Sequence, residues 1–275
     1  DIKNDFLDSY FLHDRTVRES GHDTSYRIEG YCADLNTVAL NSLLYKYESD
    51  FAHLIEIYFN GDFNGYQSAY WFQVAHERLE RMQKLMWNEE KRQYFDYNFK
   101  NKTQTHFESA SNYVPLWAGL VDVRDASKLV KTLITQLKEK GGIAGSTKKS
   151  RGEISDSRPH RQWDYPNGWA PHQMMIWKGL INYNFVKEAQ ELIYRWLYMI
   201  TKNAVDYNGT IPEKYDVVEA THKVFSEYGN VGTDFEYMSQ EGFGWMNASY
   251  QYGLTLLEDT YVEKLNQLTN PELIF

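Results

Sequence analysis

The sequence predicts an all-α fold, and two observations support that prediction. Apolar residues recur every three or four positions through most of the chain, which places an apolar stripe on one face of each helix. The segments that lack this periodicity are rich in glycine, proline, tryptophan and charged residues, which favours irregular loops. The residues that carry chemistry are therefore expected at one loop-bearing face of a helical scaffold.

The expected helices follow one another along most of the chain. A long helix begins the series, with Asp34 or Asn36 as its cap, and Gly61 breaks its apolar periodicity. A second helix is expected over 66–86, with its charged residues on the solvent side. Further helical periodicity marks six segments, at about 109–120, 125–139, 172–182, 184–204, 239–256 and 258–267.

Two stretches interrupt the helical pattern. Residues 87–107 alternate aromatic and polar side chains and carry a turn signal at Asn101, which favours a short hairpin or an extended loop. Residues 141–161 are rich in glycine and serine, partly basic, and nearly free of large apolar residues. This second stretch is expected to be a mobile loop, either a plain linker or a lid over a neighbouring site.

Composition limits the classes of function. With 275 residues, 42% of them hydrophobic, the chain is long enough for one large domain, or part of one, with a sizeable core. A net charge of −9 argues against a nucleic-acid partner. No run of about 18 apolar residues is present, so no membrane association is expected. No secretory leader is recognised at the N-terminus, where the chain begins with Asp1.

Metal and thiol chemistry receive little support from the sequence. The eight histidines lack the paired spacing of a metal site, so no metal and no cofactor is expected. Cys32 is the only cysteine, which excludes an intrachain disulfide. Its apolar neighbours favour a packed small side chain over a nucleophile.

The segment from Gln162 to Gln173 combines aromatic, polar and charged side chains more densely than any other. Trp163 and Trp169 offer flat apolar faces, and Asp164 offers a charged acceptor beside them. Prolines and a glycine in the same block favour an irregular backbone. A sugar has apolar ring faces and a rim of hydroxyl groups, so the block favours carbohydrate binding. A buried loop with aromatic packing is the alternative.

This block closely resembles a signature of the trehalases (glycoside hydrolase family 37), which split α,α-trehalose into two glucose molecules. A second similar stretch is Arg-Thr-Val-Arg-Glu-Ser-Gly-His-Asp-Thr-Ser-Tyr-Arg at 15–27. A third runs from Ile-Pro-Glu-Lys-Tyr-Asp-Val at 211–217 to Glu-Tyr-Met-Ser-Gln-Glu-Gly-Phe-Gly-Trp at 236–245. The three occur in the family's order and cover nearly the whole chain, and their wording is most similar to the neutral trehalases of fungi.

The resemblance implies an (α/α)6 barrel, two concentric rings of six helices. About eight helices are expected here, and the family's earlier Pro-Gly-Gly-Arg-Phe signature, with further substrate-binding arginines, is absent. The chain therefore resembles the C-terminal two-thirds of such a barrel, with residues 1–275 as a single domain. The resemblance also implies a cytoplasmic protein whose partners include trehalose and glucose, the N-terminal part of the same protein, and regulatory proteins.

Asp23 is the first candidate catalytic residue. It lies in a loop-like run, where Gly21 permits a ligand to approach the backbone and Arg18 and Arg27 supply positive charge. The aspartate at this place in the trehalase pattern is the general acid, with Arg18 and Gly21 in the substrate site. An Asx turn or helix cap is the structural alternative.

Glu213 is the second candidate catalytic residue. Pro212 holds the preceding residue extended, so that Glu213 opens a loop or strand end. In the trehalase pattern this glutamate is the base that activates water. The alternatives are a helix-start glutamate or a salt bridge with Lys214. Trehalases invert configuration, which calls for about 6.5–9.5 Å between the two carboxyl groups.

The resemblance assigns further residues to substrate binding. Trp163, Asp164 and Trp169 are implied to line the pocket, and Glu236 is implied to accept a sugar hydroxyl. Thr-Asp-Phe precedes Glu236 where many relatives have glycines. Trp245 is expected to serve mainly in packing. The implied activity is that of an inverting α,α-trehalase. The alternatives are an (α/α)6 glycosidase or phosphorylase on another glucoside, or a non-catalytic fragment that needs the N-terminal half.

Overall fold

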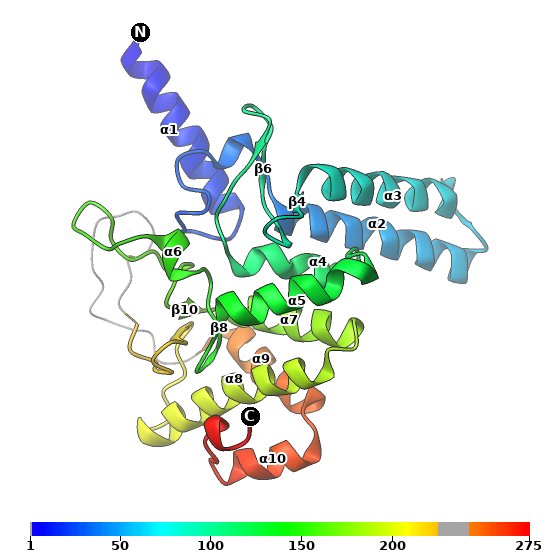
Figure 1. The fold of residues 1–275 in the computed structure, drawn as a ribbon. Coiled ribbons are helices and arrows are strands. Elements are labelled where there is room, and N and C mark those ends of the chain that lie inside the picture. Colours follow the sequence, from blue (N-terminus) through cyan, green and yellow to red (C-terminus); the bar gives the residue numbers. More distant parts are fainter. Residues whose placement is uncertain (1, 225–241) are drawn as a thin grey trace.

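The computed structural model describes residues 2–224 and 242–275, and within them the fold is mostly helical (Figure 1). The α-helices are α1 (Ile2–Glu19), α2 (Val38–Phe59), α3 (Ser68–Leu85), α4 (Val114–Ala118), α5 (Val123–Leu137), α6 (Lys148–Arg151), α7 (Ala170–Asn182), α8 (Val186–Asp206), α9 (Gly244–Leu256) and α10 (Asp259–Asn266). Three 3-10 turns are η1 (Cys32–Asp34), η2 (Ala110–Tyr113) and η3 (Pro271–Leu273). The predicted all-α class is confirmed.

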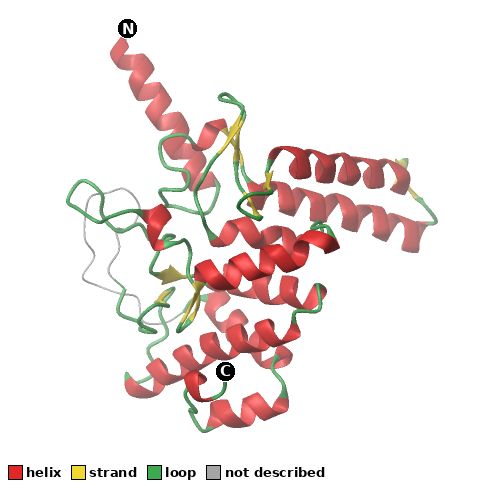
Figure 2. Ribbon diagram, in the orientation of Figure 1, coloured by secondary structure: helices red, strands yellow, loops and turns green. Residues whose placement is uncertain are grey.

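The strands are two-residue segments that lie in the loops between helices (Figure 2). They are β1 (Leu35–Asn36), β2 (Asp62–Phe63), β3 (Tyr66–Gln67), β4 (Trp87–Asn88), β5 (Gln93–Tyr94), β6 (Tyr97–Asn98), β7 (Thr103–Gln104), β8 (Lys138–Glu139), β9 (Gly142–Ile143), β10 (Asn167–Gly168) and β11 (Tyr215–Asp216). Within 87–107, where a short hairpin or an extended loop was expected, β4 pairs with β5 and β6 pairs with β7, both antiparallel, so the segment holds two short hairpins. β6 also pairs with β1, which links this hairpin to the start of α2.

Helix α7 lies at the centre of the helical body. It packs against α4, α8 and α9, and the indole rings of Trp177 on α7 and Trp196 on α8 are fully buried. Since a buried tryptophan removes a large apolar area from water, these two rings contribute strongly to the core. The N-terminal end of α7 directly follows Trp169, so the rigid centre of the body anchors the tryptophan-rich block.

Two differences from the sequence-based expectation concern the first helices. Helix α1 was not expected. Phe6, Tyr10 and Phe11 on it are more than half exposed, so most of its length has no buried stripe that periodicity could reveal. The cap of α2 is Thr37, whose hydroxyl accepts from the Leu40 amide at 3.4 Å, and not Asp34 or Asn36. Those two residues belong to η1 and β1, which precede the cap.

Other boundaries shift by a few residues. The helix expected over 109–120 is divided into η2 and α4, and Pro115 stands at the start of α4. A proline lacks an amide donor and is favoured in the first turn of a helix, so the chain restarts its helix there. The helix expected over 239–256 begins at Gly244 within the described residues.

Large apolar side chains are exposed along α1 and along the α2–α3 hairpin, which extends away from the helical body (Figure 1). They include Phe6, Phe11, Leu12, Tyr47, Ile57, Tyr58, Tyr66 and Tyr70. A search of the described ranges finds no helix with both the length and the apolar character needed to cross a membrane. An exposed apolar surface of this extent is typical of a protein–protein contact.

A buried ion pair joins the loop after α1 to the hairpin region. Arg27 donates from Nε and Nη2 to the two carboxylate oxygens of Asp96, at 2.8 and 2.9 Å, and both side chains are at most 3% exposed. Asp96 also accepts from the backbone amide of Val38 at 2.8 Å. Arg27 donates in addition to the Ser111 hydroxyl at 3.0 Å. One carboxylate therefore fixes three segments, and the positive charge of Arg27 is held in this pair.

Replacing Asp96 by alanine is expected to lower the free energy of unfolding by about 3–5 kcal/mol, because the Arg27 guanidinium would stay buried without its partner. Urea unfolding of the protein that contains this chain measures the change. Glu77→Ala is the matched control, since Glu77 pairs with Arg81 on the surface at 2.9 Å. Its loss is expected to cost less than about 1 kcal/mol. Equal effects of the two substitutions would contradict the structural role of Asp96.

Candidate active site

The tryptophan-rich block forms a tight loop that ends at α7. Trp163 and Trp169 stack face to face, with ring centroids 3.9 Å apart and planes inclined by 7°. The indole N–H of Trp169 and the side-chain amide of Asn167 both donate to the Gln162 carbonyl, at 2.7 and 3.0 Å. Trp163 and Trp169 are 7% and 2% exposed. Each ring therefore covers one face of the other, and the stack forms a buried aromatic wall against which the surrounding loops pack.

Asp164 connects this block to the Asp23 loop. Its Oδ1 accepts from the Ser25 hydroxyl at 2.7 Å, and its Oδ2 accepts from the Tyr26 amide at 2.8 Å. Because Asp164 is buried, desolvation raises its pKa to about 6, although the hydrogen bonds from Tyr26 and Ser25 act in the opposite direction. The two oxygens of Asp164 thus hold the backbone just after Asp23.

The Asp23 loop has further contacts with the block. Gln162 donates from its side-chain amide to the backbone carbonyl of Asp23, and the Trp163 amide donates to the Thr24 carbonyl at 3.1 Å. The Asp23 residue is partly buried. Its backbone is therefore fixed on the side that faces the tryptophans.

Arg18 and Gly21 lie at the junction of α1 and this loop. Arg18 donates to Asp14 at 3.0 Å. That hydrogen bond raises the pKa of the Arg18 guanidinium, and the charge of Asp23 acts in the same direction. Gly21 has a φ of +75°, which favours glycine, and no atom lies within 4 Å of the place a Cβ would occupy. The structure therefore brings Arg18 and Gly21 to the Asp23 loop, with Arg18 engaged by Asp14.

Strand pairing brings Glu213 to the other side of the block. β10 and β11 pair antiparallel, with Gly168 opposite Tyr215. Glu213 precedes β11, and its carboxylate lies 3.2 Å from the ammonium group of Lys214. That ammonium group lies 5.0 Å above the ring of Trp169. The Lys214 salt bridge considered from the sequence is thus present, and it places Glu213 beside the tryptophan stack.

The first part of the 141–161 stretch packs beneath the block. Residues 141–147 are buried, and residues 153–157 are exposed. The Gly145 amide donates to the Asn167 carbonyl at 2.7 Å, and a Cβ on Gly145 would overlap the Trp163 carbonyl. Glycine is therefore required for this close approach. A lid role stays a prediction, and the exposed part that such a lid would use is 153–157.

The half-buried His22 and the buried His172 meet beside Trp163. His22 Nε2 lies 3.4 Å from His172 Nε2, and both rings pack edge-on against Trp163, with centroids at 4.7 and 5.4 Å. Desolvation lowers the pKa of His22 to about 3, helped by the charge of Arg27. Desolvation also lowers the pKa of His172 well below its usual value. Both rings are therefore neutral at physiological pH.

The sequence indicated no site role for His22 or His172. His172 stands in the first turn of α7, three residues after Trp169, so a histidine on the helix face next to the tryptophans was the available signal. Trp245 packs edge-on against Trp169 at 5.7 Å, which agrees with the packing role expected for it. Glu236 lies outside the described residues.

The arrangement suits proton transfer more than metal or thiol chemistry. Within the described residues, no group of three His, Cys, Asp or Glu side chains is placed to hold a metal ion. Burial raises the pKa of the Cys32 thiol, which disfavours the nucleophilic thiolate. Asp23 and Glu213, by contrast, belong to two segments that are both fixed to one aromatic stack. Two carboxyl groups so placed can serve as an acid and base pair.

The chain is similar to known proteins over most of its length. Residues 1–258 match the family model described as Trehalase. The chain is 46% identical over 276 residues to the cytosolic neutral trehalase of Kluyveromyces lactis, covering 98% of this chain and 37% of that protein. It is 51% identical over 266 residues to a probable trehalase of Saccharomyces cerevisiae, covering 94% of this chain and 34% of that protein.

Solved structures give the same fold. The neutral trehalase Nth1 from Saccharomyces cerevisiae superimposes with a TM-score of 0.86 at 45% identity, over 96% of this chain and 46% of that chain. A GH63 mannosylglycerate hydrolase from Thermus thermophilus superimposes with a TM-score of 0.58 at 18% identity, over 80% of this chain and 45% of that chain. The second likeness concerns the fold alone. The expected (α/α)6 architecture is confirmed, and the chain spans less than half the length of these proteins.

The raised pKa of Asp164 predicts a pH-dependent contribution to stability. The folded protein holds the proton up to about pH 6, whereas an unfolded chain releases it near pH 4. The contribution is therefore present below about pH 4 and is lost as the pH rises to 6. The free energy of unfolding of the unsubstituted protein, relative to Asp164→Asn, is expected to fall by about 3 kcal/mol between pH 4 and pH 7.

Urea unfolding of both proteins at several pH values measures this difference. The contributions of all other titratable groups to the free energy of unfolding are common to the two proteins and cancel. Asp156→Asn is the matched control, because Asp156 is exposed. A difference for Asp164 that stays constant with pH would contradict the assignment.

Proposed function

The chain belongs to the trehalase family, and we propose that the protein of which it is part hydrolyses α,α-trehalose to two glucose molecules with inversion. The observation that carries this proposal is the attachment of the Asp23 loop and of the segment after Glu213 to one tryptophan-rich block. It gives the two motif carboxyl groups a common frame, as an acid and base pair requires.

In this mechanism Asp23 is the acid and Glu213 is the base. The Asp23 carboxyl gives its proton to the glycosidic oxygen as the bond from that oxygen to the anomeric carbon breaks. Glu213 takes a proton from a water molecule that attacks the same carbon from the opposite face. The departing sugar leaves as α-glucose and the attacked sugar becomes β-glucose. Asp23 ends ionised and Glu213 ends protonated, and exchange with solvent restores both.

Substrate binding is assigned to groups around this pair. We assign Arg18 and Gly21 to the side of Asp23, and Glu236 to a sugar hydroxyl. We assign Trp163 and Trp169 to the wall of the substrate pocket, where they act mainly through their stack, since they are only 7% and 2% exposed. Asp164 contributes mainly by holding the Asp23 loop through Ser25 and Tyr26, because both of its oxygens already accept hydrogen bonds there.

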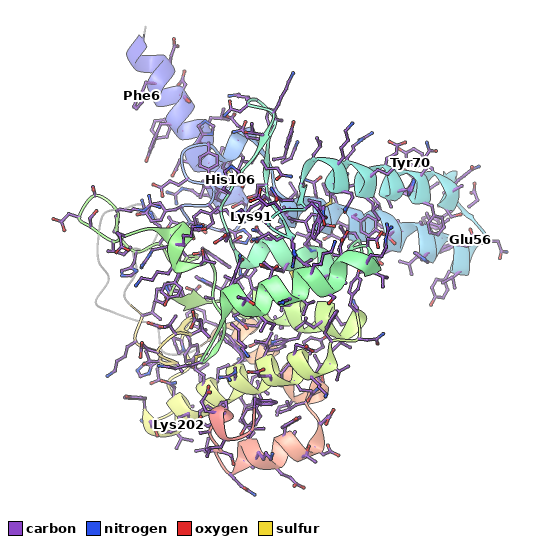
Figure 3. The ribbon with its side chains drawn as sticks, viewed as in Figure 1. Phe6, Glu56, Tyr70, Lys91, His106 and Lys202 are labelled. Atoms are coloured by element: carbon purple, nitrogen blue, oxygen red, sulfur yellow. The ribbon has the colours of Figure 1, made fainter. Side chains whose placement is uncertain are left out.

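We infer further that residues 1–275 form part of a larger (α/α)6 domain. The chain spans 37% of the length of the Kluyveromyces lactis relative. Phe6 and Tyr70, at the outer ends of α1 and α3, are 72% and 60% exposed and point away from the ribbon (Figure 3). The remaining helices of the barrel would bury such residues. We place the protein in the cytosol, as the names of its relatives state for them.

Asp23→Asn in the protein that contains this chain is expected to lower kcat by at least about a hundredfold, since an amide cannot donate the acid's proton. Glu213→Gln is expected to be comparably inactive while trehalose binding is retained. Proton NMR of the released anomers measures both rates, and equal initial α- and β-glucose from the unsubstituted protein indicates inversion.

The matched controls are Asp156→Asn and Glu90→Gln, which make the same chemical changes at exposed positions. Both are expected to retain normal turnover. Near-normal turnover in Asp23→Asn would refute the acid, and rapid glucose release by Glu213→Gln would refute the base.

The barrel proposal has its own test. Residues 1–275 produced alone are expected to bind an apolar dye strongly and to release no glucose, because the exposed surfaces of α1 to α3 lack their cover. The protein with its remaining barrel helices is expected to bind little dye and to be active. Equal dye binding by the two would contradict the proposed burial of these helices.

A further inference from the structure

The hydrogen-bonding groups around His22 and His172 favour one arrangement of protons. Nδ1 of His22 lies 3.1 Å from the Ser20 carbonyl, which can only accept, so this nitrogen must carry the proton. In neutral His22, Nε2 is then an acceptor. It faces Nε2 of His172 at 3.4 Å, so the His172 nitrogen must be the donor.

The surroundings of His172 agree with this assignment. Its Nε2 also lies 3.3 Å from the Ser111 hydroxyl, which accepts from Arg27 at 3.0 Å. Its Nδ1 is buried, with no hydrogen-bond partner in the described structure. A buried N–H without an acceptor costs about 1–3 kcal/mol, so a proton on Nδ1 is disfavoured and Nε2 carries it. Arg27, Ser111, His172 and His22 form one connected series.

Protonation at low pH disrupts this series at the contact between His22 and His172. A second proton on His22 would place an N–H on each side of the 3.4 Å contact, so that two donors face each other. A second proton on His172 would create a buried donor at Nδ1, where no acceptor lies. The desolvation that lowers the pKa of both rings is consistent with this cost.

We propose that His172 is a positioning residue for the acid: by donating from Nε2 to His22 it orients the His22–Asp23 segment, and protonation of this histidine pair releases the segment and adds to the loss of hydrolysis in acid that protonation of the base Glu213 causes. This inference rests on the proposed function, because it assigns a role in the same reaction. His172 acts through His22, which directly precedes Asp23, and its own ring is buried.

The effect is expected in kcat more than in KM. Trp163 is held independently of the histidines by its stacking on Trp169 and by the hydrogen bond from its backbone amide to the Thr24 carbonyl. Release of the pair would therefore change the orientation of Asp23 and leave the aromatic wall in place. A displaced acid slows proton transfer while substrate contacts with the wall persist.

Several charged groups share this environment and bear on the pH dependence. Arg27 opposes protonation of both histidines, and its own charge is balanced by Asp96. Asp23 directly follows His22 in the chain. Asp164 accepts from the hydroxyl of Ser25, two residues after Asp23. On the far side of the tryptophan stack, Lys214 is paired with Glu213. The test must therefore separate the histidine pair from these carboxylates, and substitution of His172 leaves all of them unchanged.

The decisive variant is His172→Gln, measured in the full-length protein that contains this chain. A glutamine amide can donate to neutral His22 through its nitrogen and accept from protonated His22 through its oxygen, and it does not titrate. At pH 7 its kcat is expected within about threefold of the unsubstituted protein, because one donor is retained. The midpoint of the acid limb of kcat is expected to move down by at least about half a pH unit.

His172→Leu removes the donor altogether and is the complementary variant. It is expected to lower kcat at pH 7 by about tenfold, with KM within about threefold. His76→Gln is the matched control, because His76 is exposed on α3, and its acid limb is expected to stay unchanged. An acid limb of His172→Gln identical to that of the unsubstituted protein would overturn the proposal. A KM rise without a kcat loss in His172→Leu would overturn it too.

Nitrogen-15 NMR of the imidazole rings tests the pair without relying on activity or on any variant. At pH 7 and at pH 5, His22 is expected to be neutral with its proton on Nδ1, and His172 neutral with its proton on Nε2. A charged His172, or one protonated on Nδ1 at pH 7, would overturn the inference. If the unsubstituted protein releases no glucose from trehalose, the proposed function fails, and the NMR result still decides the state of the pair.

Discussion

The buried carboxylate of Asp164 is the interaction on which the rest of the candidate site depends. It binds the Ser25 hydroxyl and the Tyr26 amide, in a segment 139 residues earlier in the chain than Asp164. Without an acceptor there, two buried donors would lose their partners, at a cost comparable to a large fraction of domain stability. Together with the hydrogen bonds from Gln162 to the Asp23 carbonyl and from the Trp163 amide to the Thr24 carbonyl, this contact holds the Asp23 loop against the tryptophan block.

The candidate site is polar and buried, an arrangement that is costly unless every group is satisfied. Burial acts in opposite directions on the acidic and basic groups: it favours the neutral form of Asp164 and the neutral forms of His22 and His172. The cations of this region are matched by carboxylates: Arg27 by Asp96, Arg18 by Asp14 and Lys214 by Glu213. The protein thus limits net charge next to the proposed acid, so that local electrostatics depend on few ionised groups.

Much of the helical scaffold and the three motif segments could be predicted from the sequence. Periodicity revealed helices that bury one face, such as α5 and α8, because burial imposes that pattern. It missed α1, whose apolar residues are largely exposed. The motif residues were found by resemblance, whereas their partners were not. Asp96 and His172 lie far from Asp23 in sequence, and no local rule relates a carboxylate in a hairpin or a histidine in a helix to a distant loop.

The separation between Asp164 and the Ser25–Tyr26 segment also has a consequence for the order of events during synthesis. The Asp23 loop leaves the ribosome long before the residue that anchors it exists. At about 5–20 residues per second, 139 residues take roughly 7–28 seconds to add. Through that interval the Ser25 hydroxyl and the Tyr26 amide bond to water, and the loop stays open. The proposed catalytic segment is therefore assembled late, at a stage when much of the helical scaffold on which it rests has already been made.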